Sequence, residues 1–358
     1  MKKITTLVLI ALMVLINNQA IAQKLIALQS GDKATFYTDL DSALYRAKNG
    51  DDIYLPGGYI KANSTTLKID KAVNIIGVGY NLYANPATEN TIIQSQTIQI
   101  MPNVNGGSLS GICAKNSQLQ IDNNVSNFNV NRCLFNVISM GVSNVGISPS
   151  NISIIETVVY FNIQGLQGAD SAGPQNVTIS NSIIGDISYN SKIFISDRSW
   201  ENMTCKNSIL IGYSDQYNSM IDRIMNSLFE NCVILDKTNQ YPAGNLPNTF
   251  RNCIFTAATN NWDPALNINC IFSQDRNSIF KDPQGFVFNM KNDYRLRDDS
   301  PGKNAGKDGT DIGIYGGRYP WKDGGLPVNP HIETYDIAGK TDSIGNLRVK
   351  IKVAAQEN

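Results

Sequence analysis

The sequence contains few charged residues and a single histidine, and both features argue against nucleic-acid-binding and zinc sites. Charged residues make up 17% of the 358 residues, and Lys plus Arg equal Asp plus Glu at 30 each. The chain therefore lacks the basic surplus that would neutralise a nucleic-acid backbone. The single histidine, His331, lies near the C-terminus, and no C-x-x-C is present. The sequence thus predicts no nucleic-acid partner and no metal site of the zinc type.

Long apolar runs are also missing, apart from one at the N-terminus. Leu7 to Ile16 is an unbroken apolar run, preceded by Lys2-Lys3 and followed by the small-x-small sequence Ala20-Ile21-Ala22. This order is typical of a signal peptide, and ten apolar residues are too few to cross a bilayer. We predict a signal peptide over residues 1–22, no membrane span, and a secreted protein (periplasmic, cell-surface or extracellular).

What the sequence does contain is a short repeat of an amide, a small residue and two apolar residues. The clearest copies are Asn231-Cys232-Val233-Ile234, Asn252-Cys253-Ile254-Phe255 and Asn269-Cys270-Ile271-Phe272. Weaker copies extend the series, so that the small residue stands at 111, 133, 157, 182, 208, 232, 253 and 270. A period in the low twenties with β-branched residues predicts a solenoid of stacked parallel strands. We expect about ten coils.

Four of the six cysteines occupy the small-residue position of this repeat, namely Cys133, Cys232, Cys253 and Cys270. Side chains at one position of successive coils point the same way into the interior. Their parallel Cα–Cβ directions do not favour disulfide bonds, although the spacing of the coils permits them. We therefore expect buried free thiols, with disulfides as the alternative.

Two stretches near the ends of the chain carry a resemblance to a known family. The first is Asp41 to Tyr59 (DSALYRAKNGDDIYLPGGY), followed by Lys71 to Gly79 (KAVNIIGVG). The second is Asn292 to Gly306, followed by Thr310 to Gly317 (TDIGIYGG). Together they resemble the opening and closing signatures of secreted bacterial proteins of the pectin-lyase-like superfamily.

The resemblance implies an all-β fold, a right-handed single-stranded parallel β-helix over residues 23–318. A short helix near residues 38–48 would cap one end, and the Gly-rich segment 300–318 would wrap toward the other. These signatures occur in lyases, hydrolases, adhesins and proteins without known activity, so they do not select a function.

The C-terminal extension, residues 319–358, has a different pattern. Ile332 to Ile337 and Leu347 to Val353 alternate between apolar and polar residues, with turn residues between them. This pattern predicts a β-hairpin. We expect the hairpin to pack along the solenoid, or else to serve as an export or docking tail.

The amides of the repeat form the first candidate site. Asn tolerates the left-handed backbone region that tight bends require, and its side chain can bond to the coils above and below. The sequence therefore predicts a structural ladder, while an exposed amide row that binds sugar hydroxyls is the alternative. The residues concerned are Asn181, Asn207, Asn231, Asn252 and Asn269.

A second candidate site lies around residues 192–223. Asp197-Arg198 and Asp222-Arg223 are 25 residues apart, one coil length, so they could stack on one face. A lyase that acts on uronic acids must neutralise a carboxylate and supply a base. Lys192, Arg198 and Arg223 are the weak catalytic candidates, and Asp197, Trp200, Tyr213, Tyr217 and Asp222 are the substrate-binding candidates. A solvated ladder of ion pairs is the alternative.

For function we favour an exported β-helix that interacts with a polysaccharide or a cell-surface glycan and has no demonstrated catalysis. One alternative is a polyuronate lyase that acts at the 192–223 face. Another is a purely structural or adhesive surface protein. We expect no cofactor, and Ca²⁺ only under the lyase alternative. The clustered aspartates of a glycoside hydrolase of this fold are not evident in the sequence.

Overall fold

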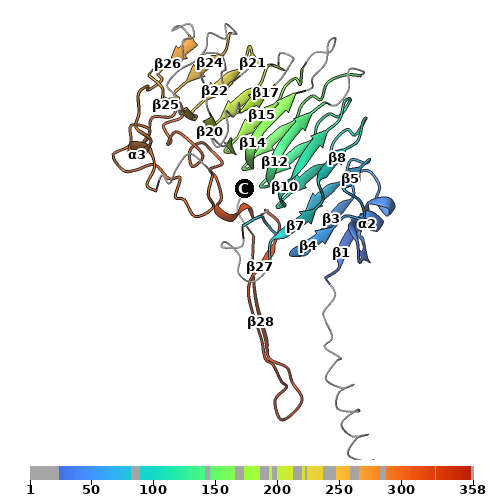
Figure 1. Ribbon diagram of the computed structural model, residues 1–358. Helices are drawn as coiled ribbons and strands as arrows, with labels where there is room; N and C mark the ends of the chain where they lie inside the picture. The colour runs from blue at the N-terminus through green and yellow to red at the C-terminus, as the bar shows by residue number, and fades with distance from the viewer. Residues whose placement is uncertain are drawn as a thin grey trace, which may run out of the picture.

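The computed structural model shows a parallel β-solenoid of about six turns (Figure 1). It describes residues 24–81, 89–141, 146–165, 173–185, 193–195, 200–212, 220–221, 224–236, 247–258, 266–282, 288–326 and 328–355. The all-β solenoid expected from the repeat is confirmed. The expected number of coils, about ten, is higher than the number of turns in the structure, about six.

The first of the two large sheets has twelve strands, and all are parallel from β3 onward. At the N-terminal end, β1 pairs in the antiparallel sense with both β2 and β3. In spatial order the strands are β2 (Lys33–Tyr37), β1 (Ile26–Ser30), β3 (Asp52–Tyr54), β6 (Asn74–Ile76), β9 (Ser108–Ser110), β11 (Asn129–Asn131), β13 (Ser153–Ile155), β15 (Thr178–Ser180), β19 (Thr204–Lys206), β22 (Leu228–Glu230), β24 (Thr249–Arg251) and β26 (Asn267–Ile268).

The second large sheet is also parallel and receives the chain directly after each short turn of the repeat. Its strands are β4 (Gly58–Lys61), β5 (Thr66–Ile69), β7 (Thr91–Gln94), β8 (Thr97–Ile100), β10 (Cys113–Ile121), β12 (Leu134–Met140), β14 (Val158–Gly165), β16 (Ile183–Ile184), β17 (Phe194–Ile195), β20 (Ile209–Gly212), β23 (Val233–Asp236) and β25 (Ile254–Phe255). A separate short pair joins β18 (Trp200–Glu201) to β21 (Ile224–Met225).

The helix expected near residues 38–48 is present as α2 (Leu40–Arg46) at the N-terminal end of the solenoid (Figure 1). Asp39 caps it by accepting a hydrogen bond from the Ser42 N–H, and its apolar face packs against β1 and β2. Two further short helices are α3 (Arg276–Ile279) and η2 (Asp323–Gly325). Among the described residues, no helix has the length and apolarity needed to cross a membrane.

The strand register confirms the repeat in the middle and C-terminal coils. Leu134, Val158, Ile183, Ile209, Val233 and Ile254 are aligned partners in the second sheet, each one residue after the small position. The position assigned to Gly111 is wrong by one residue. Cys113 pairs with Leu134, so Gly111 is aligned with Arg132 and the larger Ile112 takes the small position.

Side chains at the small position of the repeat share one kind of hydrogen bond in addition to their packing. The hydroxyl or thiol donates to the carbonyl two residues earlier, as in Thr157 to Ile155 at 2.9 Å and Ser208 to Lys206 at 2.7 Å. Cys232 and Cys253 point to the equivalent carbonyls at 3.4 Å. The hydroxyls of Thr157, Ser182 and Ser208 also accept an N–H from the preceding coil. Cys, Ser and Thr are therefore interchangeable here, and the six cysteines are free.

The two apolar residues after the small position face opposite sides of the second sheet. The later one points into the solenoid, as Phe135, Ile184 and Phe255 do. The earlier one points outward into a second apolar cluster, which includes Leu134, Val158, Ile183, Ile209, Val233 and Ile254. Both faces of this sheet are buried in the coils from Leu134 to Ile254, which explains why the repeat carries two consecutive apolar residues there.

The outer cluster is completed by residues 288–326, which we call the cover segment. Ile312, Ile314 and Trp321 are buried against the second sheet, and the segment runs beside the strands of the solenoid (Figure 1). Within residues 300–318, Gly302 and Ala305 lie against Ile254 and Asn252 near the C-terminal end of the solenoid. Ile312 and Ile314 belong to the outer cluster on the second sheet, so the segment also covers that sheet.

The C-terminal hairpin is confirmed as β27 (His331–Ile337) and β28 (Val349–Ala354), which pair in the antiparallel sense. Its expected packing along the solenoid is wrong. The strands are largely exposed, and the hairpin projects away from the solenoid (Figure 1).

The burial of the cysteines leads to a test of the core. Burial raises the pKa of the Cys133 thiol to about 12, so it is protonated and unreactive at neutral pH. Cys270 is the least buried of the six. We expect Ellman's reagent to modify one thiol of the native protein quickly, and the other five only after denaturation. The fast phase should disappear in Cys270→Ser. A disulfide detected by mass spectrometry of the non-reduced protein would contradict this packing.

Candidate functional site

A groove of about 850 Å³ lies between the first sheet and the cover segment. We call it the cover groove. It is lined by Ser110, Asn131, Arg132, Ile155, Glu156, Ser180, Asn181, Lys206, Asn207, Glu230, Asn231, Lys307, Asp308, Gly317, Arg318, Tyr319, Lys322 and Val328.

The floor of the cover groove is one column of outward-facing residues at the ends of the first-sheet strands. Six strands in register contribute Ser110, Asn131, Ile155, Ser180, Lys206 and Glu230. With neighbouring strands about 4.8 Å apart, this column is about 24 Å long. A groove of this length suits a linear chain better than a small molecule.

Directly after the first-sheet strands, the chain turns through a left-handed backbone conformation in each coil from Gly111 to Asn269. Gly111, Arg132, Glu156, Asn181, Asn207, Asn231, Asn252 and Asn269 all have φ between 45° and 65°. Gly and Asn adopt this region at low cost, whereas an ordinary side chain costs about 1–2 kcal/mol. The tight turn between the sheets thus explains the asparagines of the repeat.

The side chains of these turns hold the cover segment in place. The Asn181 amide donates to the carbonyls of Ile314 and Gly316 at 2.8 and 3.0 Å. The Asn231 side chain accepts the Lys307 N–H at 2.9 Å, and the Asn252 amide donates to Ala305 at 2.8 Å. The structural interpretation of these amides stands, but their expected bonding from coil to coil is wrong for these three residues, since they bind the cover segment.

Close packing of the cover segment also requires glycine at one point. Gly317 has φ of 82°, and a Cβ atom there would collide with the side-chain amide nitrogen of Asn207. The Gly-Gly pair that ends the closing signature therefore lets the backbone approach the asparagine column.

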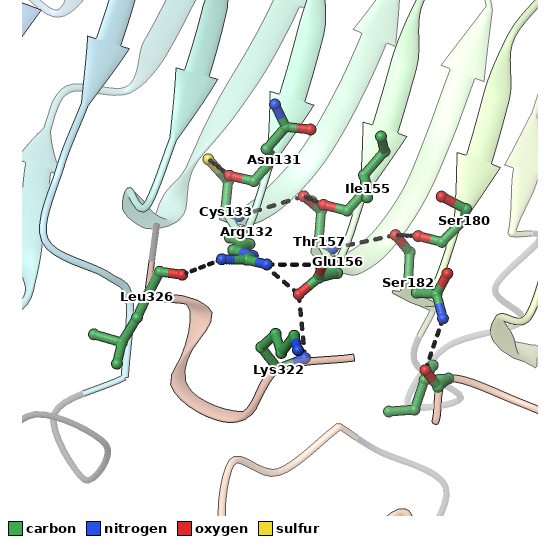
Figure 2. A network of polar contacts seen from close by, with 12 residues as sticks. Asn131, Arg132, Cys133, Ile155, Glu156, Thr157, Ser180, Ser182, Lys322 and Leu326 are labelled. Carbon is green, nitrogen blue, oxygen red and sulfur yellow. Dashed lines mark hydrogen bonds and ion pairs between the residues drawn. The ribbon is translucent and has the colours of Figure 1, made fainter. Parts of the chain in front are cut away.

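Two coils replace the asparagine with a buried ion pair, shown in Figure 2. The Arg132 guanidinium donates to both oxygens of Glu156, at 3.0 and 3.1 Å, and to the Leu326 carbonyl at 2.8 Å. Glu156 also accepts the Lys322 N–H at 3.1 Å. Both side chains are more than nine-tenths buried. The pair joins the solenoid to the end of the cover segment.

A second ionic cluster lies at the other end of the floor. The Glu230 carboxylate contacts Lys206 at 3.1 Å, Arg251 at 3.0 Å and Lys307 at 3.4 Å. Burial raises the pKa of Glu230, but the hydrogen bonds from Lys206 and Arg251 outweigh it and hold the pKa below its ordinary value of 4.5. Glu230 is therefore ionised at neutral pH.

The wall of the cover groove adds cations that face solvent. The lining contains five basic and three acidic side chains. In the described part of the chain, neither Arg318 nor Lys322 forms an ion pair. Arg318 lies 5.3 Å from the centroid of the Tyr319 ring, which is 51% exposed. The groove thus combines positive charge, an exposed aromatic ring and a floor that contains hydroxyl and amide groups, one isoleucine and the Lys206–Glu230 ion pair.

Most residues predicted for the 192–223 face lie outside the described residues. These are Lys192, Asp197, Arg198, Tyr213, Tyr217, Asp222 and Arg223. Trp200 is the exception. It is fully buried, and its ring meets Phe194 edge to face at 5.9 Å. The expectation that Trp200 contacts substrate is therefore wrong in this conformation, because the ring fills the solenoid.

Sequence reasoning missed the cover groove because its wall comes from a segment distant in the chain. It also missed a second asparagine column, which does bond from coil to coil. Asn127 donates to Asn105 at 2.7 Å, and Asn151 and Asn176 continue the series at 3.2 Å. Its positions, 105, 127, 151 and 176, recur with the period of the repeat and could have revealed it.

The described residues contain no cluster of three or more His, Cys, Asp or Glu side chains that could hold a metal ion. Comparison with known proteins finds no matching family model and no curated protein with a significant match. The fold and the groove geometry are therefore the basis for a functional inference.

The Arg132–Glu156 pair generates the first test of this site. Arg132→Ala leaves Glu156 buried without its counter-ion, so we expect a loss of about 3–5 kcal/mol in unfolding free energy. The matched control is Arg132→Asn with Glu156→Asn, which gives both turns the residue of the later coils and should cost less. Urea denaturation measures both variants. An Arg132→Ala protein as stable as wild type would contradict the role of the pair.

Glu230 generates a test of pH dependence. Its pKa in the folded protein lies below 4.5, so its ion pairs stabilise the fold fully above that pH. This contribution is lost as the pH falls through the folded pKa. Glu230→Gln should therefore reduce stability at pH 7, and the difference from wild type should shrink below pH 4.5. A difference that stays constant from pH 7 to pH 3 in thermal unfolding would refute this assignment.

Proposed function

We propose that this protein is exported and binds an anionic polysaccharide in the cover groove. The observation that carries the proposal is the groove itself, about 24 Å long, with the exposed Arg318 and the half-buried Lys322 on one wall. Charged groups of a bound chain would contact these cations, and its hydroxyls would contact the floor. The N-terminal run Leu7 to Ile16 supports export.

Several features favour a glycan over a protein as the ligand. The floor presents the polar side chains of Ser110, Asn131 and Ser180 beside the apolar Ile155 in one straight column, which can contact both the hydroxyls and the apolar faces of a linear sugar chain. The Tyr319 ring is exposed at the wall, where it can stack on the face of a sugar.

Polyuronate cleavage is the second candidate function of this protein. It rests on the resemblance to the pectin-lyase-like superfamily and on the residue types at the 192–223 face, which the described residues do not include. A cleaving enzyme would produce an unsaturated product that absorbs in the ultraviolet. Incubation with polygalacturonate and alginate, with and without Ca²⁺, tests this candidate separately from binding.

The binding proposal is tested by removing the two free cations together. Arg318→Ala with Lys322→Ala should weaken binding of polygalacturonate, alginate or heparin about tenfold in isothermal titration, because two charge pairs are lost. Wild-type binding should also weaken as salt is added. The Lys322 N–H bond to Glu156 persists in the alanine variant, so the wall should stay in place.

Lys340→Ala with Lys350→Ala is the matched control, because both lysines lie on the projecting hairpin. It should bind like wild type. The proposal fails if wild type binds none of the three polyanions, or if the Arg318 and Lys322 variant binds them unchanged.

A further inference from the structure

A second groove of about 850 Å³ lies on the second sheet, near the N-terminal end of the solenoid. It lies along a corner of the coils. In two coils this corner separates β4 from β5 and β7 from β8, and in the next coil it is the point between Ala114 and Gln118 where the register of β10 shifts. We call it the corner groove. It shares no lining residue with the cover groove.

The floor of the corner groove is an open part of an apolar column that is buried elsewhere. Tyr59 pairs with Ile92, Ile92 with Cys113, and Cys113 with Leu134. From Leu134 onward this column lies under the cover segment. Tyr59, at the opposite end, is 70% exposed. An exposed tyrosine beside a half-buried isoleucine forms a flat apolar surface of the kind on which a sugar ring stacks.

The rim of the corner groove consists of short polar side chains. Asn63, Gln94, Gln96 and Asn116 are exposed, and each comes from the end of a strand or from the corner that follows it. Their amides can donate and accept at the same time, which is how proteins bind the vicinal hydroxyls of sugars. The rim thus surrounds the apolar floor with groups suited to the edge of a pyranose.

The charge of the corner groove is positive. Its lining contains Lys61 and Lys115 and no carboxylate. The Lys115 ammonium lies 4.6 Å from the centroid of the Tyr160 ring, which fixes its position at one end of the groove. A ligand with a carboxylate next to a stackable ring would satisfy both the floor and the cations.

We propose that the corner groove is a second binding site, which takes a short oligosaccharide that contains uronate. Three strands at about 4.8 Å spacing give a site of about 10 Å, shorter than the cover groove. One sugar ring stacks on Tyr59, its hydroxyls bond to the amides of the rim, and its carboxylate pairs with Lys61. Lys115, at the opposite end of the groove, pairs with the carboxylate of another ring of the oligosaccharide. The site is independent of polymer binding in the cover groove.

The test uses a protein in which the cover groove is already weakened, Arg318→Ala with Lys322→Ala. Isothermal titration with uronate trisaccharides (galacturonate, glucuronate, mannuronate and guluronate) should still show binding of at least one of them. Adding Tyr59→Ala should weaken that binding at least tenfold. Adding Lys61→Ala with Lys115→Ala should remove the preference for the bound trisaccharide over neutral maltotriose.

The matched control is Tyr335→Ala, which removes a tyrosine that is 57% exposed on the hairpin and should leave binding unchanged. The proposal is overturned if the starting protein binds none of the trisaccharides, or if Tyr59→Ala binds as tightly as before. Loss of polymer binding through Arg318 and Lys322 with trisaccharide binding intact separates this site from the cover groove.

Discussion

The structure depends on one backbone constraint, the left-handed turn that joins the first sheet to the second in the coils from Gly111 to Asn269. In each of these coils one residue after the first-sheet strand has positive φ, and in most of them that residue is Asn or Gly. The side chains of these turns form a column on the outside of the solenoid. Asn181, Asn231 and Asn252 use their amides to bind the cover segment. The asparagines that the turns of the solenoid require therefore also hold the segment that forms the wall of the cover groove.

Arg132 and Glu156 show what the column can accommodate. Both have positive φ, which is costly for their side chains, and together they form a buried ion pair that reaches Leu326 and Lys322. The strain is offset by fixing the end of the cover segment. Beyond that end the apolar column of the second sheet is open, and Tyr59 and Ile92 line the corner groove. The extent of the cover segment thus determines both where the cover groove has a wall and where the corner groove begins.

The solenoid could be predicted from the sequence because its determinants are local. The repeat, the capping helix behind Asp39 and the alternating hairpin strands each depend on neighbouring residues. The position of the cover segment could not be predicted in the same way, since Ile312 and Ile314 pack in a cluster with strand residues that are distant in the sequence. The candidate site suffered from the same limit. Trp200 was predicted to be an exposed ring, although it fills the core. The sequence around Arg318 and Lys322 contains no pattern that would predict a groove.

The central claim is that the asparagine column holds the cover segment as a fixed wall. Hydrogen exchange of peptides from residues 302–326 measures this most directly, because the Gly313 N–H bonds to the Asn231 carbonyl and the Lys307 N–H bonds to its side chain. The account predicts that these amides exchange as slowly as those of β20 and β23, and that Asn231→Gly, which keeps the turn but removes the amide, accelerates exchange at Lys307. Rapid exchange throughout residues 302–326 in the wild-type protein would contradict it.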